Sequence, residues 1–392
     1  MLHKSDYTAA GVPVVNPANI VNGAICTDKI MYISSAKAQE LSKYLLSSGD
    51  ILLARRGDLS KCAIITNNNV GWLCGTGSFV MHLCLVESSY FQYIYATQYI
   101  QSLLNTASVG ATMDNLNQDA FSNILIPIPP QNEQQRIIKE IRHWFDLIDS
   151  INNSKQELIE VIGATKSKIL DLAIHGKLVP QDPNDEPASE LLKRIAPHAV
   201  PCDTSHYENL PASWSFATIE QLCTIIGGLW TGKKPPFVRV GVIRNTNFRK
   251  DFKLDLTNVA YLDVESKQFA KRQLEYGDLI LEKSGGSEKQ PVGRTILFDR
   301  KESGYSYSNF TAVLRINDKN VITPHFLYYV LLDMYLKGAT RHMQKQTTGI
   351  HNLIMDKYIA LTIPIPPIAE QNRIVKTISD VYNILDEISA EL

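Results

Sequence analysis

The sequence lacks the features that mark several common protein classes. It has no run of about 18 apolar residues, which a helix needs to cross a bilayer, and residues 1–15 contain no apolar core of a secretion signal. Its six cysteines, at positions 26, 62, 74, 84, 202 and 223, form no Cys-X-X-Cys pair. A zinc ribbon, a thioredoxin motif and a disulfide framework are therefore excluded, and we expect reduced thiols in a cytoplasmic protein.

The chain as a whole also lacks an excess of charge of one sign. Its net charge is −1 over 392 residues, of which 44% are apolar, so the composition is that of a globular protein. The charge is unevenly spread, because residues 214–362 carry +7, residues 1–128 carry −1 and the remaining segments carry −7. We expect the basic segment to bind a polyanion and the acidic segments to bind protein partners.

Motifs of the common enzyme chemistries are missing as well. Gly227–Lys234 resembles a phosphate-binding loop, but it has a lysine where a Ser or Thr must bind magnesium. Asp278, Asp299 and Lys301 resemble the acidic pair and lysine of a nuclease, yet the matching stretch earlier in the chain is Asn67–Asn69. No GxGxxG, HExxH or GxSxG pattern occurs. The sequence thus predicts no catalytic residues and no metal site, and it favours a recognition protein over an enzyme.

What the chain does contain is a repeat of itself. Ile126–Lys139, which begins Ile-Pro-Ile-Pro-Pro, matches Ile363–Lys376 at an offset of 237. Gly49–Leu53 matches Gly277–Leu281 at an offset of 228. Shorter matches keep the same order, namely Gly77–Phe79 with Ser308–Phe310 and Asn115–Leu116 with Asn352–Leu353. The sequence therefore predicts two copies of one unit, each a mixed domain followed by a helix.

A heptad pattern follows the Pro-Pro pair in both copies. Apolar residues recur at positions a and d, which is typical of a coiled-coil seam. The predicted seam residues are Ile137, Ile141, Trp144, Ile148, Ile151, Leu158, Ile162, Ile374, Ile378, Val381, Leu385 and Ile388. Since proline is tolerated at a helix entrance and glycine ends helices, we expect the first helix to run from Gln131 to His175 and to stop at Gly176. An amphipathic helix packed only on its own domain is the alternative.

The second helix is predicted to be much shorter than the first, because only Ile368–Leu392 follows its Pro-Pro pair. A pseudo-twofold relation between the copies would place the two helices antiparallel, so that part of the longer seam stays uncovered. We expect Leu158, Ile162 and Ile169 to be exposed. Their exposure predicts self-association through the seam or tight binding of partner subunits.

The fold class predicted from these patterns is α+β, with two similar mixed lobes separated by long antiparallel coiled-coil helices. Residues 1–128 form the first lobe and 129–178 its spacer helix, 179–212 a proline-rich linker or capping segment, 213–366 the second lobe, and 367–392 the short second helix. Alignment of the copies places Met1 near Leu229, so we expect the first lobe to be short at its N-terminus. Expected elements are strands at Asp278–Leu281, Arg294–Phe298 and Phe310–Ile316, and helices at Tyr90–Leu104, Ala188–Ile195 and Pro324–Lys337.

Basic residues of the second lobe alternate with aromatic and amide side chains. Arginine and lysine bind phosphates, while arginine, asparagine and glutamine can also bind base edges. The predicted nucleic-acid contacts are Lys233, Lys234, Arg239, Arg244, Asn247, Arg249, Arg341, Lys345 and Gln346, with Arg55, Arg56 and Lys61 in the first lobe. For any single residue, plain solvation of a surface charge is the simpler alternative.

The repeated Ile-Pro-Ile-Pro-Pro motif with its Glu-Gln-X-Arg-Ile continuation, the heptad helices and the stretch Lys166–Gln181 resemble the specificity subunit of a type I restriction–modification system. The resemblance covers nearly the whole chain. It implies two target-recognition domains that each read one half of a split site in double-stranded DNA, and a helical spacer between them. It also implies two modification subunits docked along the helices, together with restriction subunits.

The resemblance further implies that this chain is not an enzyme and holds no cofactor. S-adenosylmethionine for adenine N6 methylation, and ATP with magnesium for translocation and cleavage, would bind the partner subunits. The alternatives are a coiled-coil scaffold that binds only protein, or an inactive specificity fragment or recombination cassette without DNA binding of its own. Both alternatives predict no salt-dependent DNA affinity, whereas a DNA reader predicts an affinity whose logarithm falls with the logarithm of salt concentration.

Overall fold

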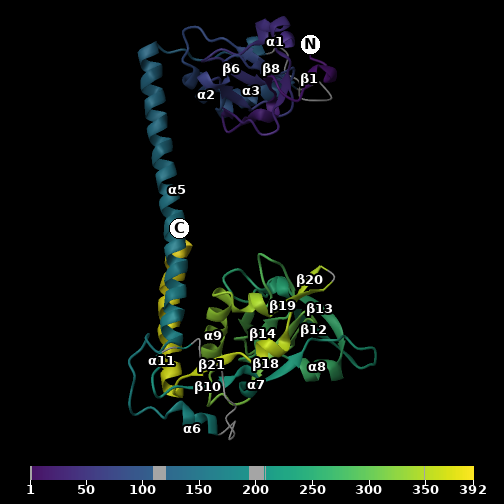
Figure 1. The fold of residues 1–392 in the computed structure, drawn as a ribbon, viewed down its shortest axis with the longest axis vertical. Helices are drawn as coiled ribbons and strands as arrows, with labels where there is room; N and C mark the ends of the chain where they lie inside the picture. Colours follow the sequence, from purple (N-terminus) through teal and green to yellow (C-terminus); the bar gives the residue numbers. More distant parts are fainter. Residues whose placement is uncertain (1, 109–120, 194–206, 208, 348) are drawn as a thin grey trace. The chain divides into compact units, whose positions relative to one another are not determined.

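The computed structural model describes residues 2–108, 121–193, 207, 209–347 and 349–392. The chain divides into two compact units, the first comprising Met1–Asn153 and the second Ser154–Leu392. Helix α5 (Gln131–Ile174) begins in the first unit and ends in the second (Figure 1). None of the helices in the described ranges is both long and apolar enough to cross a membrane.

The first unit is a set of short strands with helices packed against them. Its strands are β1 (Tyr7–Thr8), β2 (Val12–Val15), β3 (Ile20–Val21), β4 (Ala24–Ile25), β5 (Met31–Ile33), β6 (Ile51–Ala54), β7 (Cys62–Ile64), β8 (Leu73–Cys74) and β9 (Ser78–Met81). Its helices before α5 are α1 (Ser35–Glu40), α2 (Ser88–Tyr95) and α3 (Gln98–Ser108). One sheet has the order β1-β5-β2-β8, another has the order β7-β6-β9, and β3 pairs with β4.

The second unit repeats this plan with additional strands. Its strands are β10 (Ser215–Thr218), β11 (Cys223–Gly227), β12 (Phe237–Ile243), β13 (Ala260–Glu265), β14 (Leu279–Glu282), β15 (Ser284–Gly286), β16 (Thr295–Leu297), β17 (Tyr305–Tyr307), β18 (Thr311–Ile316), β19 (Gln344–Thr347), β20 (Ile350–Leu353) and β21 (Thr362–Ile365). Its helices after α5 are α6 (Ala188–Lys193), α7 (Ile219–Leu222), α8 (Ser266–Arg272), α9 (Pro324–Leu336), α10 (Met355–Ile359) and α11 (Ile368–Glu391). The sheets have the orders β11-β18-β14-β16, β13-β12-β17, β15-β20-β19 and β10-β21.

Strand pairing confirms the predicted duplication. In the first unit β2 pairs antiparallel with β5 and parallel with β8, and in the second unit β12 pairs antiparallel with β13 and parallel with β17. Strand β6 pairs with β9 so that Leu53 faces Phe79, and β14 pairs with β18 so that Leu281 faces Ala312. Leu53 and Leu281 are the last residues of the two matched segments that begin Gly-Asp, so the pairing follows the sequence repeat.

The central strand of each unit divides the core in the same way. Because side chains alternate along a strand, Ile51 and Leu53 of β6 enter one apolar cluster while Leu52 enters another. Leu279 and Leu281 of β14 likewise pack toward α9, while Ile280 packs on the opposite face. Strands buried on both faces are apolar throughout, which explains why these two segments lack a polar alternation.

A buried glutamine joins each lobe to the helix that follows it. The side chain of Gln134 accepts a hydrogen bond from the Glu87 backbone N–H at 2.8 Å and donates to the carbonyls of Leu85 and Pro129. Gln371, the equivalent residue of the second copy, accepts from the Thr323 N–H at 2.8 Å and donates to the carbonyls of Val321 and Pro366. Both glutamines are fully buried, so these contacts fix how each helix leaves its lobe.

The copies differ at their first strands. Strand β10, helix α7 and strand β11 have no counterpart among the described residues of the first unit. Residues 125–128, which correspond to β21, form no strand there. The predicted match between Asn115–Leu116 and Asn352–Leu353 involves the segment 109–120, which lies outside the described residues.

The predicted helix and strands of the second lobe are confirmed to within one or two residues by α9, β14, β16 and β18. In the linker, α6 confirms the predicted helix from Ala188 to Lys193, and its predicted last two residues lie outside the described residues. The helix predicted at Tyr90–Leu104 is instead two helices, α2 and α3. The break occurs because the Thr97 hydroxyl accepts a hydrogen bond from the Ile100 N–H at 3.5 Å and donates to the Ile94 carbonyl at 2.6 Å. This side chain ends one helix and caps the next.

Helix α5 has the predicted extent, from Gln131 to Ile174. Gly176 follows with a φ of +65°, the left-handed conformation that closes helices. A Cβ atom at this glycine would approach Pro211 to 2.6 Å. The stop signal at Gly176 is therefore also a point of close packing.

Within the second unit, α11 packs antiparallel on the C-terminal part of α5, as predicted. Lys155 donates to the backbone carbonyl of Leu392 at 2.7 Å, while further along α5 the Tyr382 hydroxyl donates to the Lys166 carbonyl at 2.9 Å. Lys166 also forms an ion pair with Asp386. Ile374 and Ile378 are fully buried, whereas Val381 and Leu385 are half-buried and Ile388 is exposed.

The prediction that Leu158, Ile162 and Ile169 are all exposed was wrong for two of them. Ile162 is buried and Ile169 half-buried, because α11 covers the end of α5 nearest the second lobe, and only Leu158 of the three is exposed. The exposed seam positions of α5 are Trp144, Ile148, Ile151 and Leu158, most of which precede the part of the helix that α11 covers. Ile137 and Ile141, nearer the first lobe, are half-buried.

Replacing Gln371 by alanine tests the junction between lobe and helix. The variant Gln371→Ala leaves three buried backbone groups without a partner, so we expect the free energy of unfolding of the second unit to fall by about 3 kcal/mol. Urea denaturation measures it. The adjacent exposed Asn372→Ala is the matched control, and an equal effect of the two substitutions would contradict the role of Gln371.

Candidate nucleic-acid interface

Both units place a short 3-10 turn directly after the middle strand of one sheet. Turn η2 (Pro17–Asn19) follows β2, and η5 (Asn245–Asn247) follows β12. The last asparagine of each turn is buried, and its side-chain oxygen accepts a backbone N–H three residues earlier, at 3.1 Å for Asn19 and 2.9 Å for Asn247. Its side-chain nitrogen donates to two backbone carbonyls in each case.

This geometry removes Asn247 from the predicted nucleic-acid contacts. Its side chain is 2% exposed, and both of its N–H donors are used within the protein. The residue therefore shapes the turn and cannot reach a base. Arg244, at the N-terminal end of the same turn, is exposed and remains available.

Three of the predicted contacts lie on adjoining elements of the second unit. Beside Arg244, the Asn245 side chain donates to the Ser284 carbonyl of β15 at 2.7 Å. The Ser284 hydroxyl donates to the Asn352 side chain of β20 at 2.7 Å, and Asn352 lies opposite Lys345 in the β19–β20 hairpin. We name the hairpin surface as the set Arg244, Lys283, Ser284, Phe310, Lys345, Gln346 and Asn352. It combines basic, amide, hydroxyl and aromatic groups.

Four members of the hairpin surface were missed in the sequence: Lys283, Ser284, Phe310 and Asn352. The Lys283 backbone N–H donates to the Phe310 carbonyl at 3.0 Å, which holds the exposed ring beside β15. The repeat could have revealed Lys283, because it is the equivalent of Arg55, which the sequence analysis did single out. Strands β6 and β14 both lead directly into a basic residue.

A buried ion pair supports the hairpin surface from beneath. The Arg294 guanidinium donates to the Glu282 carboxylate at 2.8 Å, and both side chains are nearly inaccessible. The guanidinium also lies 5.3 Å from the centre of the Phe248 ring, which follows turn η5. Burial raises the pKa of Glu282, although the hydrogen bond from Arg294 opposes this effect. Arg294 is thus a positioning residue and not a contact.

A second group of predicted residues lies at the other end of β12. Arg239 is 3.7 Å from Asp263 on β13, and the backbone N–H groups of Lys233 and Lys234 both donate to Glu265 at 3.3 Å. Five residues of extended chain separate Arg239 from Arg244, a span of about 17 Å. The sequence prediction therefore divides into two groups of exposed basic side chains.

Arg249 and Arg341 stand apart from both groups. Arg249 forms an ion pair with Asp251 at 2.9 Å, and the nearby Lys253 pairs with Asp386 of α11 at 2.6 Å. Burial alone would raise the pKa of Asp386, but the hydrogen bonds from its two lysine partners outweigh this effect and lower it. Part of this basic cluster is therefore used to hold the second unit together. Arg341 is exposed on a 3-10 turn that leads directly into β19.

The three predicted residues of the first unit lie in the loop between β6 and β7, which contacts the equivalent turn through Lys61. Arg55 directly follows β6, with its guanidinium 5.1 Å from the centre of the Phe79 ring. Lys61 donates to the Pro17 carbonyl in η2 at 3.1 Å. Arg56 is exposed and occupies the position of Ser284 in the second unit. The corner of each unit around its 3-10 turn, η2 in the first and η5 in the second, is therefore basic.

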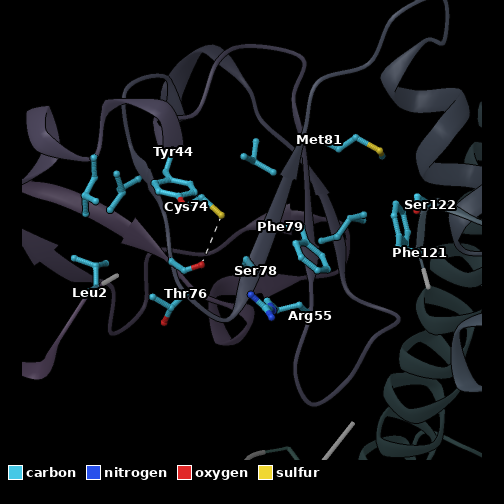
Figure 2. A pocket seen from close by; sticks show the side chains of 15 residues that line it. Leu2, Tyr44, Arg55, Cys74, Thr76, Ser78, Phe79, Met81, Phe121 and Ser122 are labelled. Carbon is cyan, nitrogen blue, oxygen red and sulfur yellow. Dashed lines mark hydrogen bonds between the residues drawn. The ribbon is translucent and has the colours of Figure 1, made fainter. Parts of the chain in front are cut away.

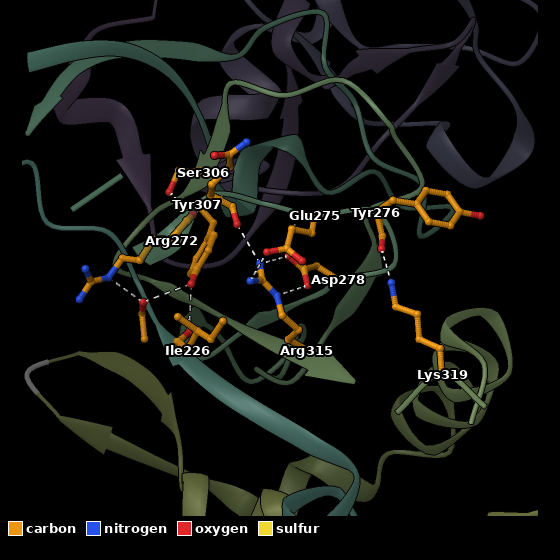
Figure 3. Close-up of polar contacts among 11 residues, drawn as sticks. Ile226, Arg272, Glu275, Tyr276, Asp278, Ser306, Tyr307, Arg315 and Lys319 are labelled. Carbon is orange, nitrogen blue, oxygen red and sulfur yellow. Dashed lines mark hydrogen bonds and ion pairs between the residues drawn. The ribbon is translucent and has the colours of Figure 1, made fainter. Parts of the chain in front are cut away.

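Asp278, one of the two acidic residues that resemble a nuclease pattern, has a structural role. Asp278 is buried and accepts hydrogen bonds from Arg315 at 2.9 and 2.7 Å, and Glu275 binds the same guanidinium (Figure 3). Its carboxylate is therefore already neutralised by an arginine. Within the described part of the chain, no group of three or more His, Cys, Asp and Glu side chains is arranged to hold a metal ion.

The comparisons with known proteins agree on one family. A family model described as type I restriction modification DNA specificity domain matches residues 1–160 and 211–392. The specificity subunit of the EcoKI type I restriction enzyme from Escherichia coli K12 is 21% identical over 99% of this chain and 78% of its own length. The EcoEI specificity subunit from Escherichia coli is 24% identical over 88% of this chain and 69% of its length.

A solved structure shows that the fold is shared as well. The HsdS subunit from Thermoanaerobacter tengcongensis superposes with a TM-score of 0.56 at 17% identity, over 97% of this chain and 85% of that chain. At this identity the likeness concerns the fold alone. It agrees with the duplicated arrangement of strands and helices described above.

Reversing the charge of Arg244 tests the hairpin surface. The variant Arg244→Glu is expected to weaken binding to a DNA duplex by about tenfold or more, because a basic contact is replaced by a repulsive one. Fluorescence anisotropy at fixed salt concentration measures the affinity. Lys301→Glu, at an exposed lysine in the loop between β16 and β17, is the control, and the same loss in both variants would contradict the assignment.

Proposed function

Because this chain belongs to the family of type I restriction–modification DNA specificity domains, we propose that it is the DNA-specificity subunit of such a system. The observation that carries the proposal is the duplication of one basic corner. Each unit presents cationic side chains around the 3-10 turn that follows its middle strand, at η2 in the first unit and η5 in the second. Two copies of one reader suit a DNA target that consists of two halves.

In this proposal each lobe reads one half of the target. The target-recognition domains comprise residues 1–128 and 213–366, and the linker 179–212 connects the first spacer to the second domain. Residues 129–178 and 367–392 are the spacer helices. Phosphate contacts from lysine and arginine position each lobe, while Arg244 and Gln346 of the hairpin surface supply contacts to base edges. The remaining predicted contacts, from Lys233 to Arg239 and at Arg249 and Arg341, are assigned to phosphates.

The chain itself is proposed to be non-catalytic and to act in the cytoplasm, where its DNA would be. Adenine methylation with S-adenosylmethionine, and cleavage with ATP and magnesium, are assigned to modification and restriction subunits. The two modification subunits are proposed to dock on the acidic helices, where the exposed stripe Trp144, Ile148 and Ile151 offers an apolar surface. Exposed apolar stripes on helices typically bind another helix.

Lengthening α5 tests its proposed role as a spacer. Insertion of one heptad after Asn153 adds about 10 Å of helix, which corresponds to about three base pairs. We expect the gap between the two recognised halves to lengthen by that amount. Sequencing the adenines methylated by the complex with its modification subunit measures the gap. A heptad added after Leu392 serves as the control, and an unchanged gap in the inserted variant would refute the spacer.

Two charges placed on the exposed stripe test the docking of partners. The double variant Trp144→Glu, Ile148→Glu is expected to lose co-purification of the modification subunit, because an apolar contact becomes charged. DNA affinity should stay unchanged. The same variant should abolish any self-association of the isolated chain in light scattering. Asp146→Ala is the control, because this exposed residue lies on the side of the helix opposite Trp144 and Ile148. Retained co-purification in the double variant would contradict docking at this stripe.

A further inference from the structure

A short hairpin follows the 3-10 turn in each unit, at residues 20–25 in the first and 248–254 in the second. We name these two segments the post-turn hairpins. Each is closed onto the buried asparagine of its turn, whose backbone carbonyl accepts the N–H of Cys26 at 2.7 Å in the first unit and of Asp255 at 2.8 Å in the second. The turn and its hairpin therefore form one small body in both units.

A helix side chain holds the tip of each post-turn hairpin. The amide of Gln92 in α2 donates to the Gly23 carbonyl at 2.8 Å, and the hydroxyl of Tyr328 in α9 donates to the Phe252 carbonyl at 2.9 Å. The two accepting residues share the left-handed conformation, with φ of +79° at Gly23 and +60° at Phe252. A bulky residue keeps this conformation only where its surroundings hold it, and the Phe252 ring packs edge-on against Tyr335 at 5.7 Å.

The repeat shows that Gln92 and Tyr328 are equivalent residues. The N-cap residues of α2 and α9 are Glu87 and Thr323, and they match because the buried glutamine of each junction accepts the backbone N–H of one of them. Gln92 and Tyr328 both lie five positions after these N-caps. Two different side chains at one position of the repeat thus make the same contact, which indicates that the contact itself is needed.

The next residue of each helix contacts the spacer helix of the same unit. Tyr93 stacks on Phe145 of α5 with ring centres 6.2 Å apart, and Tyr329 meets Tyr382 of α11 edge-on at 6.2 Å. Phe145 and Tyr382 both lie 11 positions after the buried glutamine of their junction. Two successive side chains of α2, and of α9, therefore connect the spacer helix to the post-turn hairpin.

The 3-10 turn is packed on its other side as well. A Cβ atom at Gly77 would approach Pro17 of η2 to 3.0 Å, and the Gly77 carbonyl accepts the N–H of Arg55 at 3.0 Å. Figure 2 shows Arg55 beside Phe79, with its guanidinium 5.1 Å from the ring centre. In the second unit Asn245 of η5 contacts β15 at the corresponding place. Each turn thus lies between a strand end that carries a basic residue and its own hairpin, so a displaced hairpin would displace the turn.

We propose that Gln92 and Tyr328 are equivalent positioning residues for DNA recognition, each of which holds the 3-10 turn of its unit at a fixed place relative to the spacer helix. The proposal rests on the proposed function, in which the surfaces around these turns read DNA. Neither side chain touches DNA. Arg244, at the start of η5, makes the contact, and a hydrogen bond to a base edge weakens steeply when its donor is misaligned. Loss of the anchor therefore costs discrimination between bases.

Amide hydrogen exchange of the free chain tests the anchor without DNA. In Tyr328→Phe the ring stays and one hydrogen bond is lost, so exchange in residues 248–255 should become about fivefold faster. Mass spectrometry of the peptides that cover this segment measures the rate. Tyr329→Phe is the matched control, because it removes a hydroxyl from the same helix and keeps the ring contact with Tyr382. Unchanged exchange in Tyr328→Phe, or equal acceleration in both variants, would overturn the proposal.

Sequencing the adenines methylated by the complex with its modification subunit tests the effect on recognition. In Tyr328→Phe, methylation at sites with a wrong base in one half of the target should rise about fivefold relative to correct sites. In Gln92→Ala the same rise should occur for the other half, while the gap between the halves stays constant. A residue that only stabilises the fold would lower the total methylation without relaxing either half.

The outcomes separate the positioning role from the proposed function. Gln98→Ala, at an exposed glutamine that begins α3, is the control for the first unit. An unchanged base requirement in Tyr328→Phe and Gln92→Ala, or relaxation of the same half by both, would overturn the positioning role. An unsubstituted complex that methylates no two-part sequence would contradict the proposed function instead, and the exchange rates would still decide whether Tyr328 holds the turn.

Discussion

The junction between each lobe and its helix depends on one buried amide. Gln134 and Gln371 lie in the first turn or two of their helices, and each side chain holds three backbone groups of the lobe that it follows. A buried amide with all of these partners tolerates little movement, because any displacement leaves polar groups unpaired. A specificity subunit needs such a junction, since a spacer can measure distance only if it leaves its reader at a fixed angle.

Most of the architecture could be predicted from the sequence, because the two copies of the repeat can be compared with each other. Matches at offsets of 228 and 237 identify the central strands and the helix starts, and the heptads give the extent of α5. The first of these matches also relates Asp50 to Asp278, each of which accepts a backbone N–H three residues earlier at 2.8 Å. Repetition of a buried polar residue with its partner is stronger evidence for a shared fold than hydrophobic periodicity alone, because few arrangements satisfy such a group.

The sequence was less informative about the candidate site, and the reason is physical. A basic or amide residue on a loop has the same composition whether it binds DNA or the protein itself. Asn247 was predicted to contact nucleic acid, but its amide completes a turn, whereas Arg244 in the same turn stays exposed. Lys283 and Phe310 were missed because their place beside Arg244 depends on pairing between strands distant in sequence. The uncovered part of the seam was misplaced for a similar reason, since it depends on where α11 lies.

The central claim is that two equivalent corners read two different halves of one target. The most direct measurement sequences the adenines methylated by the complex when it carries Arg56→Ala in the first unit or, separately, Arg244→Ala in the second. The account predicts that each substitution relaxes the sequence requirement in one half only, and in a different half for each. Relaxation of the same half by both substitutions, or of both halves by either, would contradict it.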